Sequence, residues 1–103
     1  MTDEASVAVV WRGPFTNAEV HELHAEAFET RLYDVSEWNW EDVMARHSLG
    51  WATARVADGL VGFVNVPWDG FAHASIQDVM VALSARRRGI ATRLVRLARG
   101  SGL

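Results

Sequence analysis

Three consecutive arginines and a glycine form the part of this sequence best suited to chemistry. Arg86, Arg87 and Arg88 precede Gly89, and the apolar residues that follow recur at helical spacing. The start of a helix exposes unpaired backbone amides and carries about half a positive charge, so it attracts phosphate. Gly89 lets the backbone approach such a ligand, and arginine binds phosphate through two parallel hydrogen bonds. The residues therefore predict a site for a phosphorylated anion at the start of this helix.

Apolar runs separated by turn signals predict the strands around this site. The β-branched or alternating runs lie at residues 6–11, 51–56, 60–66 and 72–83. Asp58 and Gly59 form a typical two-residue hairpin turn between the second run and the third. Residues 68–70 predict a further turn, and the fourth run leads directly toward the arginines.

Capping residues predict two helices between the first strand and the second. Thr16 and Glu19 form a capping box, in which each side chain satisfies the other residue's backbone amide. Ser36 or Asn39 caps a second, short helix that ends at Gly50. The helix after the arginines ends at Gly100, which is a suitable C-cap. The predicted order is β-α-α-β-β-β-α, an α/β fold in a single domain over residues 1–103.

The composition excludes several kinds of protein. Half of the 103 residues are apolar and 22% are charged, which is typical of a globular chain. There is no cysteine, so disulfides, cysteine-ligated metals and thiol catalysis are excluded, and no metal cofactor is expected. All 10 basic residues are arginine, which excludes a P-loop and a lysine Schiff base. The chain has no apolar run of membrane-spanning length and no secretory signal, so the expectation is a cytoplasmic protein without a membrane partner.

Charge is distributed unevenly along the chain. Residues 1–50 carry a net charge of −7 and residues 51–103 carry +4, and six arginines lie between positions 86 and 99. Two interpretations remain: solvated faces of opposite sign, or one surface for a cation and another for an anion. Nucleic acid is not an expected partner, because the whole chain is acidic and its arginine-rich stretch contains no aromatic residue.

At this point the sequence resembles a known family. Residues 78–81 (DVMV), followed by 86–91 (RRRGIA) at the start of an amphipathic helix, are similar to the acetyl-coenzyme A (acetyl-CoA) motif of the GNAT N-acetyltransferases. Arg86, Gly89 and Ala91 match the fixed positions of that family's pattern, Gln/Arg-x-x-Gly-x-Gly/Ala. The predicted order of elements also matches the first two thirds of the family fold. The resemblance therefore implies a GNAT-like α/β fold and acetyl-CoA as the donor.

The resemblance also implies site residues. Backbone groups of Val79, Met80 and Val81 would pair with the pantetheine arm of acetyl-CoA. The pyrophosphate cradle would comprise the residues of the motif turn and the first helical turn: Arg86, Arg87, Arg88, Gly89, Ile90, Ala91 and Thr92. A backbone amide near Met80 or Val81 would polarise the thioester carbonyl, while a carboxylate or a water removes the proton from the amine.

The residues leave the general base open. Asp78 is a candidate because it lies beside the proposed thioester position, and His73 is another. The alternative is that the Asp78 carboxylate is satisfied by backbone amides or faces the opposite side of the strand. His21 and His24 lie three residues apart, whereas zinc-binding helices of the metalloprotease type use four, so one surface histidine and one half-buried histidine are expected.

The residues also leave the acceptor open. The acidic residues of the two predicted helices and their loop suit a cationic amine or form a solvated face: Glu22, Glu26, Glu29, Asp34, Glu37, Glu41 and Asp42. Four tryptophans line an apolar acceptor pocket or belong to the core: Trp38, Trp40, Trp51 and Trp68.

The resemblance ends at the motif helix, and this bears on function. The family continues with a fifth strand, a helix and a further strand, which this sequence does not contain. The expectation is a truncated product, a fragment, or a partial domain completed by a second copy. Tyr33, the only tyrosine, is not expected to replace the family's thiolate-protonating tyrosine.

Two functions are therefore expected: acetyl transfer to a primary amine, or an inactive remnant that binds coenzyme A or a protein partner. An open fourth strand also predicts a homodimer or a poorly soluble monomer.

Overall fold

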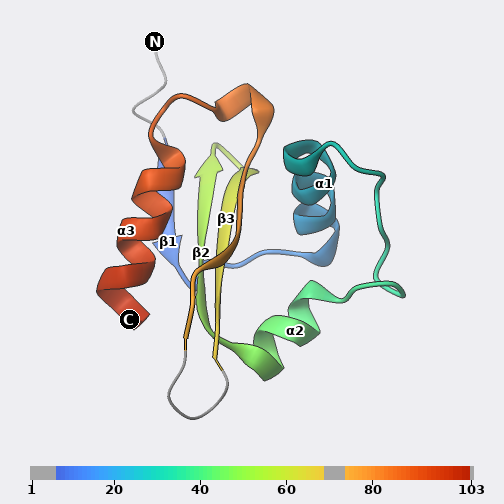
Figure 1. Ribbon diagram of the computed structural model, residues 1–103. Coiled ribbons are helices and arrows are strands. Elements are labelled where there is room, and N and C mark those ends of the chain that lie inside the picture. Colours follow the sequence, from blue (N-terminus) through green and yellow to red (C-terminus); the bar gives the residue numbers. More distant parts are fainter. Residues whose placement is uncertain (1–6, 69–73, 103) are drawn as a thin grey trace.

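Four antiparallel strands form the centre of the protein in a computed structural model that describes residues 7–68 and 74–102 (Figure 1). The strands are β1 (Val7–Trp11), β2 (Ser48–Val56), β3 (Gly59–Pro67) and β4 (Gln77–Val81). They lie side by side in chain order, so β4 pairs with β3 alone among the described strands. The β3–β4 register places Gly62 opposite Val81, and β4 forms one edge of the sheet.

Three helices cover the two faces of this sheet. Helices α1 (Asn17–Phe28) and α2 (Trp40–His47) lie over one face, and α3 (Ile90–Gly102) lies over the other (Figure 1). The predicted α/β class and the predicted order of elements are therefore confirmed. No helix in the described part of the chain is both long enough and apolar enough to span a bilayer.

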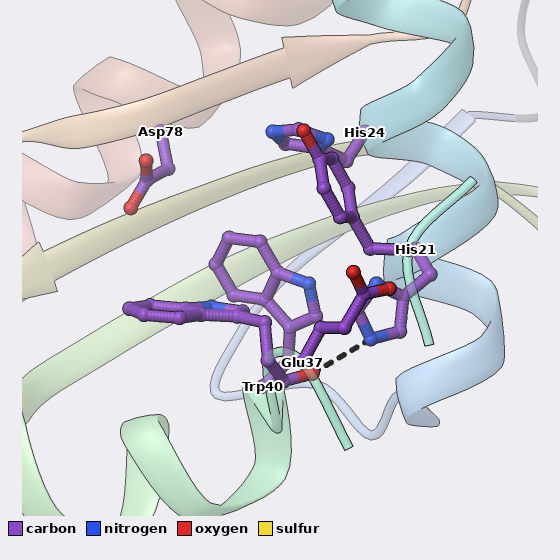
Figure 2. Close-up of a pocket in the computed structure, with 7 residues that line it drawn as sticks. His21, His24, Glu37, Trp40 and Asp78 are labelled. Carbon is purple, nitrogen blue, oxygen red and sulfur yellow. Dashed lines mark hydrogen bonds between the residues drawn. The ribbon is translucent and has the colours of Figure 1, made fainter. Parts of the chain in front are cut away.

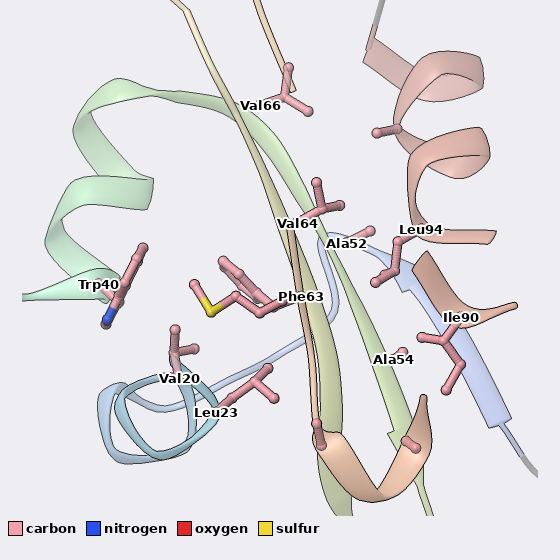
Figure 3. Close-up of a cluster of buried hydrophobic side chains, with 14 of the residues drawn as sticks. Val20, Leu23, Trp40, Ala52, Ala54, Phe63, Val64, Val66, Ile90 and Leu94 are labelled. Carbon is pink, nitrogen blue, oxygen red and sulfur yellow. The ribbon is translucent and has the colours of Figure 1, made fainter. Parts of the chain in front are cut away.

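The sheet separates two layers of buried side chains (Figure 3). On the first face, Phe63 has no exposed surface and its ring lies 6.1 Å from that of Trp40. On the second face, Ile90 and Leu94 of α3 are 2% and 0% exposed and pack against the strands. Each layer fixes helices that carry predicted site residues, so the positions of those residues depend on core packing.

Side-chain caps begin the first two helices as the sequence indicates. The backbone amide of Glu19 donates to the Thr16 hydroxyl at 3.2 Å, and the Thr16 amide donates to the Glu19 carboxylate at 3.0 Å. The predicted capping box is confirmed. Asn39 rather than Ser36 caps α2, because its side-chain oxygen accepts from the Asp42 amide at 2.9 Å.

Three predicted boundaries are wrong. Gly50 does not end α2 but lies inside β2, where an added Cβ would stand 2.1 Å from the Trp11 ring. The hairpin turn is Ala57 and Asp58 rather than Asp58 and Gly59, because Gly59 already pairs with Val56. Helix α3 continues through Gly100 to Gly102, so Gly100 is not its C-cap.

The predicted strand at 72–83 is too long. Strand β4 covers only Gln77–Val81, and residues 72 and 73 lie outside the described part, as do residue 6 of the first strand and residues 69–70 of a predicted turn. The Ala82 amide makes the last bond to β3, donating to the Val61 carbonyl at 2.8 Å. The chain then turns into a short 3-10 helix, Leu83–Ala85, closed by a 2.9 Å bond from the Ala85 amide to the Ala82 carbonyl.

Candidate functional site

A bulge in β4 marks the centre of the candidate site. Met80 pairs with Phe63 and Gln77 pairs with Asn65, so Asp78 and Val79 together face one residue of β3. Asp78 has a φ of 55°, in the left-handed region, which is rare outside glycine. A bulge changes the direction of the side chains that follow it. Here it places Asp78 in one pocket and Val79 in another.

The second of these pockets lies between β4 and the start of α3 and is called the donor pocket below, after the acetyl donor that the resemblance implies. It encloses about 280 Å³. Its lining residues come from β4, the 3-10 helix, the arginine turn and the first turn of α3: Val79, Val81, Ala85, Arg86, Arg87, Gly89, Ile90, Ala91 and Thr92. All but two of the predicted acetyl-CoA residues are therefore gathered here. The exceptions are Met80, whose side chain is fully buried in the core, and Arg88, which is exposed outside the lining.

The start of α3 gives the donor pocket its polar groups. Gly89 has a φ of 74°, and no atom lies within 4 Å of the place where a Cβ would stand. The Arg93 amide makes the first helical bond, to the Gly89 carbonyl at 3.0 Å. Among the described residues, the backbone amides of Ile90, Ala91 and Thr92 have no acceptor. The pocket thus offers several unpaired donors at the positive end of a helix, which is an environment suited to an anion.

Arg86 lines the donor pocket and also forms tertiary hydrogen bonds that the sequence does not indicate. Its guanidinium donates to the Val81 carbonyl at 3.3 Å and to the Ala27 carbonyl at 2.8 Å. One residue earlier on α1, the Glu26 carboxylate accepts from the Leu83 amide at 2.7 Å. These bonds attach the 3-10 helix, and with it the arginine turn, to the end of α1. Only the tertiary structure brings these partners, more than fifty residues apart, together.

The other pocket at the β4 bulge, called the acceptor-side pocket below, lies on the α1 and α2 side of the sheet (Figure 2). It encloses about 370 Å³. Its lining is aromatic and acidic: His21, His24, Tyr33, Glu37, Trp38, Trp40 and Asp78. Figure 2 shows Asp78 on one side and the two histidines on the other. Trp51 and Trp68, which the sequence grouped with the other tryptophans, do not line it.

Charges in the acceptor-side pocket differ in how they are compensated. Arg31 donates to both oxygens of Glu37, at 3.1 and 2.5 Å, and this pairing holds the pKa of the Glu37 carboxyl below its usual range. The Arg31 guanidinium also lies 4.0 Å from the centre of the Tyr33 ring. Asp78 forms no ion pair with another described residue. The pocket therefore contains one carboxylate that is not neutralised by a described cation.

The two histidines of α1 both face this pocket. His21 is 5% exposed, and its Nε2 lies 2.7 Å from the Trp38 carbonyl oxygen. His24 is half-buried, with its ring 5.9 Å from that of Tyr33 and 6.1 Å from that of Trp40. The expected surface histidine is therefore wrong, since neither is exposed. No cluster of three potential metal ligands occurs within residues 7–68 and 74–102, and His73 lies outside these ranges.

Comparison with known proteins identifies relatives of this arrangement. A family model described as the acetyltransferase (GNAT) family matches residues 16–100. No curated protein matches the chain. A GNAT family acetyltransferase from Streptococcus pneumoniae TIGR4 is 24% identical with a TM-score of 0.71, over 93% of this chain and 67% of that one.

Two Brucella structures are similar as well. A GNAT family acetyltransferase from Brucella melitensis, solved in complex with acetyl-CoA, is 19% identical with a TM-score of 0.69, over 93% of this chain and 70% of that one. A ribosomal-protein-alanine N-acetyltransferase from Brucella melitensis biovar Abortus 2308 is 20% identical with a TM-score of 0.65, over 92% of this chain and 70% of that one. At these identities the structures establish the fold, and this chain spans about two thirds of their length.

Proposed function

The chain belongs to the GNAT acetyltransferase family, and on that premise we propose that it transfers an acetyl group from acetyl-CoA to a primary amine. One observation carries the proposal: neighbouring residues at the bulge of β4 line the two pockets, Val79 the donor pocket and Asp78 the acceptor-side pocket. An amine in one pocket and a thioester in the other would meet beside this strand. Such positioning supplies much of the rate in a reaction between two bound substrates.

In this proposal the donor pocket binds the phosphates and the arm of acetyl-CoA. The unpaired amides at the start of α3 would donate to the pyrophosphate, and the guanidinium of Arg87 would add positive charge and further hydrogen-bond donors. The arm would extend along Val79 and Val81, which line the same pocket. The acetyl group would then lie beside the bulge, next to Asp78.

The proposed reaction needs a neutral amine and a polarised thioester. The ammonium first loses a proton, and the amine nitrogen then bonds to the acetyl carbon. A backbone amide of β4 near Met80 or Val81 would stabilise the oxyanion that forms. The nitrogen then gives up its second proton to solvent and the carbon–sulfur bond breaks. The amide product keeps the acetyl group, and the thiolate of coenzyme A takes a proton from solvent. Asp78 remains the candidate base, because it is the acceptor-side carboxylate closest in sequence to that amide.

Titration with acetyl-CoA by calorimetry tests the donor site. We expect saturable binding to the full chain. Ala91→Glu should weaken binding at least about tenfold, because a carboxylate in the donor pocket repels phosphate although it favours the start of a helix. Ala18→Glu is the matched control, since Ala18 is an exposed residue in the first turn of α1. Equal affinity in both variants would exclude the donor pocket as the binding site.

Release of coenzyme A in the presence of amines separates activity from binding alone. Coenzyme A release that is faster with an amine than without one supports the proposed acetyltransferase activity. Saturable binding without turnover for any amine supports the alternative, a coenzyme A-binding remnant. Mass measurement of the acetylated amine identifies the product in either case, because acetyl transfer to water would release coenzyme A without changing the amine.

A further inference from the structure

The acceptor-side pocket has a chemistry that selects its ligand, and we infer that it binds a primary amine with an aromatic body and no acidic group. The inference rests on the proposed function, because it names the acceptor of that reaction. Three features carry it: the aromatic walls, the balance of charge, and the position of Asp78 next to the donor pocket.

The walls of the pocket suit a flat, apolar body. The Trp38 and Trp40 rings are 5.8 Å apart in an edge-on arrangement, and Tyr33 and His24 form a second such pair at 5.9 Å. Aromatic rings favour further edge-to-face contacts with an aromatic ligand. The volume of about 370 Å³ lies within the ordinary range for small-molecule sites. Trp38 is 48% exposed, so a ligand can reach its ring.

The charges of the pocket select an ammonium group. Glu37 is paired with Arg31, whereas Asp78 has no described cationic partner, so the lining carries one uncompensated negative charge. No arginine lines the pocket, so a carboxylate on the ligand would find no guanidinium there to pair with. An amino acid with a free carboxylate is therefore disfavoured, while a simple arylalkylamine is neutralised on binding.

The position of Asp78 orients the ligand. Asp78 stands across the pocket from the α1 histidines (Figure 2), and its neighbour Val79 lines the donor pocket. An ammonium at Asp78 would therefore stand at the side where the thioester is expected. The aromatic body would extend away from β4, toward Tyr33 and Trp38. Asp78 is then an anchor that positions the amine, in addition to being the candidate base.

Calorimetry with the full chain and no acetyl-CoA tests the inference with 2-phenylethylamine and three analogues. The neutral analogue is 2-phenylethanol, the anionic one is 3-phenylpropionate, and the aliphatic one is butylamine. We expect 2-phenylethylamine to bind at least about tenfold more tightly than each analogue. Equal or tighter binding of the anion or of the aliphatic amine would overturn the inference.

Two variants with matched controls locate the site. Asp78→Asn should weaken 2-phenylethylamine about tenfold and leave 2-phenylethanol unchanged, whereas Asp58→Asn, in the β2–β3 turn, should change neither. Trp38→Ala should weaken both 2-phenylethylamine and 2-phenylethanol about fivefold, while Trp68→Ala, at a tryptophan of similar exposure (44%) outside the pocket, should not. Unchanged binding in both pocket variants contradicts the inference even if the chain proves active.

The turnover assay separates this inference from the proposed function. If coenzyme A release requires aliphatic polyamines and excludes 2-phenylethylamine, the function holds and the inference fails. If the chain binds no acetyl-CoA while the ligand preference holds, the proposed function fails and the specificity of the pocket stands. A raised KM with unchanged kcat in Asp78→Asn supports the anchor, and a lowered kcat with unchanged KM assigns Asp78 to the base alone.

Discussion

Two glycines near opposite ends of α3 should respond in opposite ways to replacement by alanine. Gly89 has a φ of 74°, and an added Cβ would meet no atom within 4 Å, so Gly89→Ala costs only backbone strain, about 1 kcal/mol. Gly100 is helical and equally uncrowded, so Gly100→Ala should stabilise by about 0.5 kcal/mol. Urea unfolding of both variants measures the free energies. If both substitutions change the free energy of unfolding in the same direction, Gly89 is not in the left-handed conformation or Gly100 is not helical.

Glu19 should make stability depend on pH in a defined direction. Its carboxylate accepts from Arg55 at 2.7 and 2.8 Å, and this hydrogen bonding lowers the pKa of Glu19 below its usual value of 4.5. A lowered pKa stabilises the folded state above pH 4.5, and the gain is lost as pH falls through the folded pKa. Glu19→Gln keeps the capping box but loses the ion pair, so it should cost about 1 kcal/mol at neutral pH.

The pH dependence of that difference is the decisive measurement. Unfolding free energies of the wild type and Glu19→Gln should converge as pH falls below 4.5. Glu22→Gln is the control, because Glu22 is exposed on the same helix and forms no ion pair with a described residue. A constant difference between wild type and Glu19→Gln from neutral to acid pH would show that the ion pair does not stabilise the fold.

Single residues also show what the sequence could predict about the site. Gly89, Arg86 and Arg87 line the donor pocket and stand close together in the chain, so a short motif was sufficient to group them. The acceptor-side pocket depends on His24 of α1 and Glu37 of the segment between α1 and α2, which line one pocket with Asp78 only through the tertiary fold. Their types and spacing alone carry no signal for that encounter. The sequence therefore named acidic and aromatic candidates without identifying which of them share a pocket.

At the scale of elements, the connection from β4 to α3 is held by α1. Glu26 accepts from the Leu83 amide at 2.7 Å, and Arg86 donates to the Ala27 carbonyl at 2.8 Å. Glu26→Ala should destabilise the fold by about 1 kcal/mol, and it should weaken acetyl-CoA binding severalfold because the arginine turn loses one of its anchors. Calorimetric titration and urea unfolding measure the two effects separately.

The controls for this connection lie on the same helix. Glu26→Gln keeps an acceptor for the Leu83 amide and should restore most of both properties, whereas Glu22→Ala removes an exposed carboxylate without a described partner. If Glu26→Ala binds acetyl-CoA as tightly as the wild type, α1 does not position the arginine turn. The Glu26→Ala, Arg86→Ala double variant should show coupling, because both residues attach the same segment.

Elements whose signals include short-range side-chain partners were confirmed, whereas several boundaries were wrong, two of them because a neighbouring element decides. The capping box of α1 and the turn before α3 were predicted because their partners lie within a few residues. Gly50 was assigned to a helix end, yet the close approach of Trp11 explains why a glycine stands inside β2. The apolar run at 72–83 indicated one strand, but pairing with β3 ends at the Ala82 amide, and the chain turns there.

At the scale of the whole molecule, the two pockets lie on opposite faces of a single sheet edge. The first layer of core residues, around Phe63, supports the acceptor-side pocket, and the second, around Leu94, supports the donor pocket. Composition and periodicity predicted the strands and helices that carry these layers, because apolar residues recur on each element. They could not predict that neighbouring residues of the β4 bulge line one pocket each, since a bulge with Asp78 at a φ of 55° has no reliable local signal.

The open edge of β4 leads to the last prediction. Among the described strands, β4 pairs only with β3, and its sequence QDVMV contains a single charge to discourage pairing with another chain. We therefore expect the chain to self-associate through this edge as concentration rises. The family resemblance implies that the arm of acetyl-CoA pairs with the same strand, so the ligand and a second copy should compete for it.

Sedimentation velocity with and without ligand tests this competition. Acetyl-CoA should shift the chain toward the monomer, because it occupies backbone groups that the second copy would use. Adenosine 3′,5′-bisphosphate, which carries phosphates but no pantetheine arm, should leave the association unchanged. A monomer at every concentration without ligand would show that the β4 edge does not associate. A dimer that persists with saturating acetyl-CoA would instead place the interface elsewhere, because one strand edge cannot pair with both partners at once.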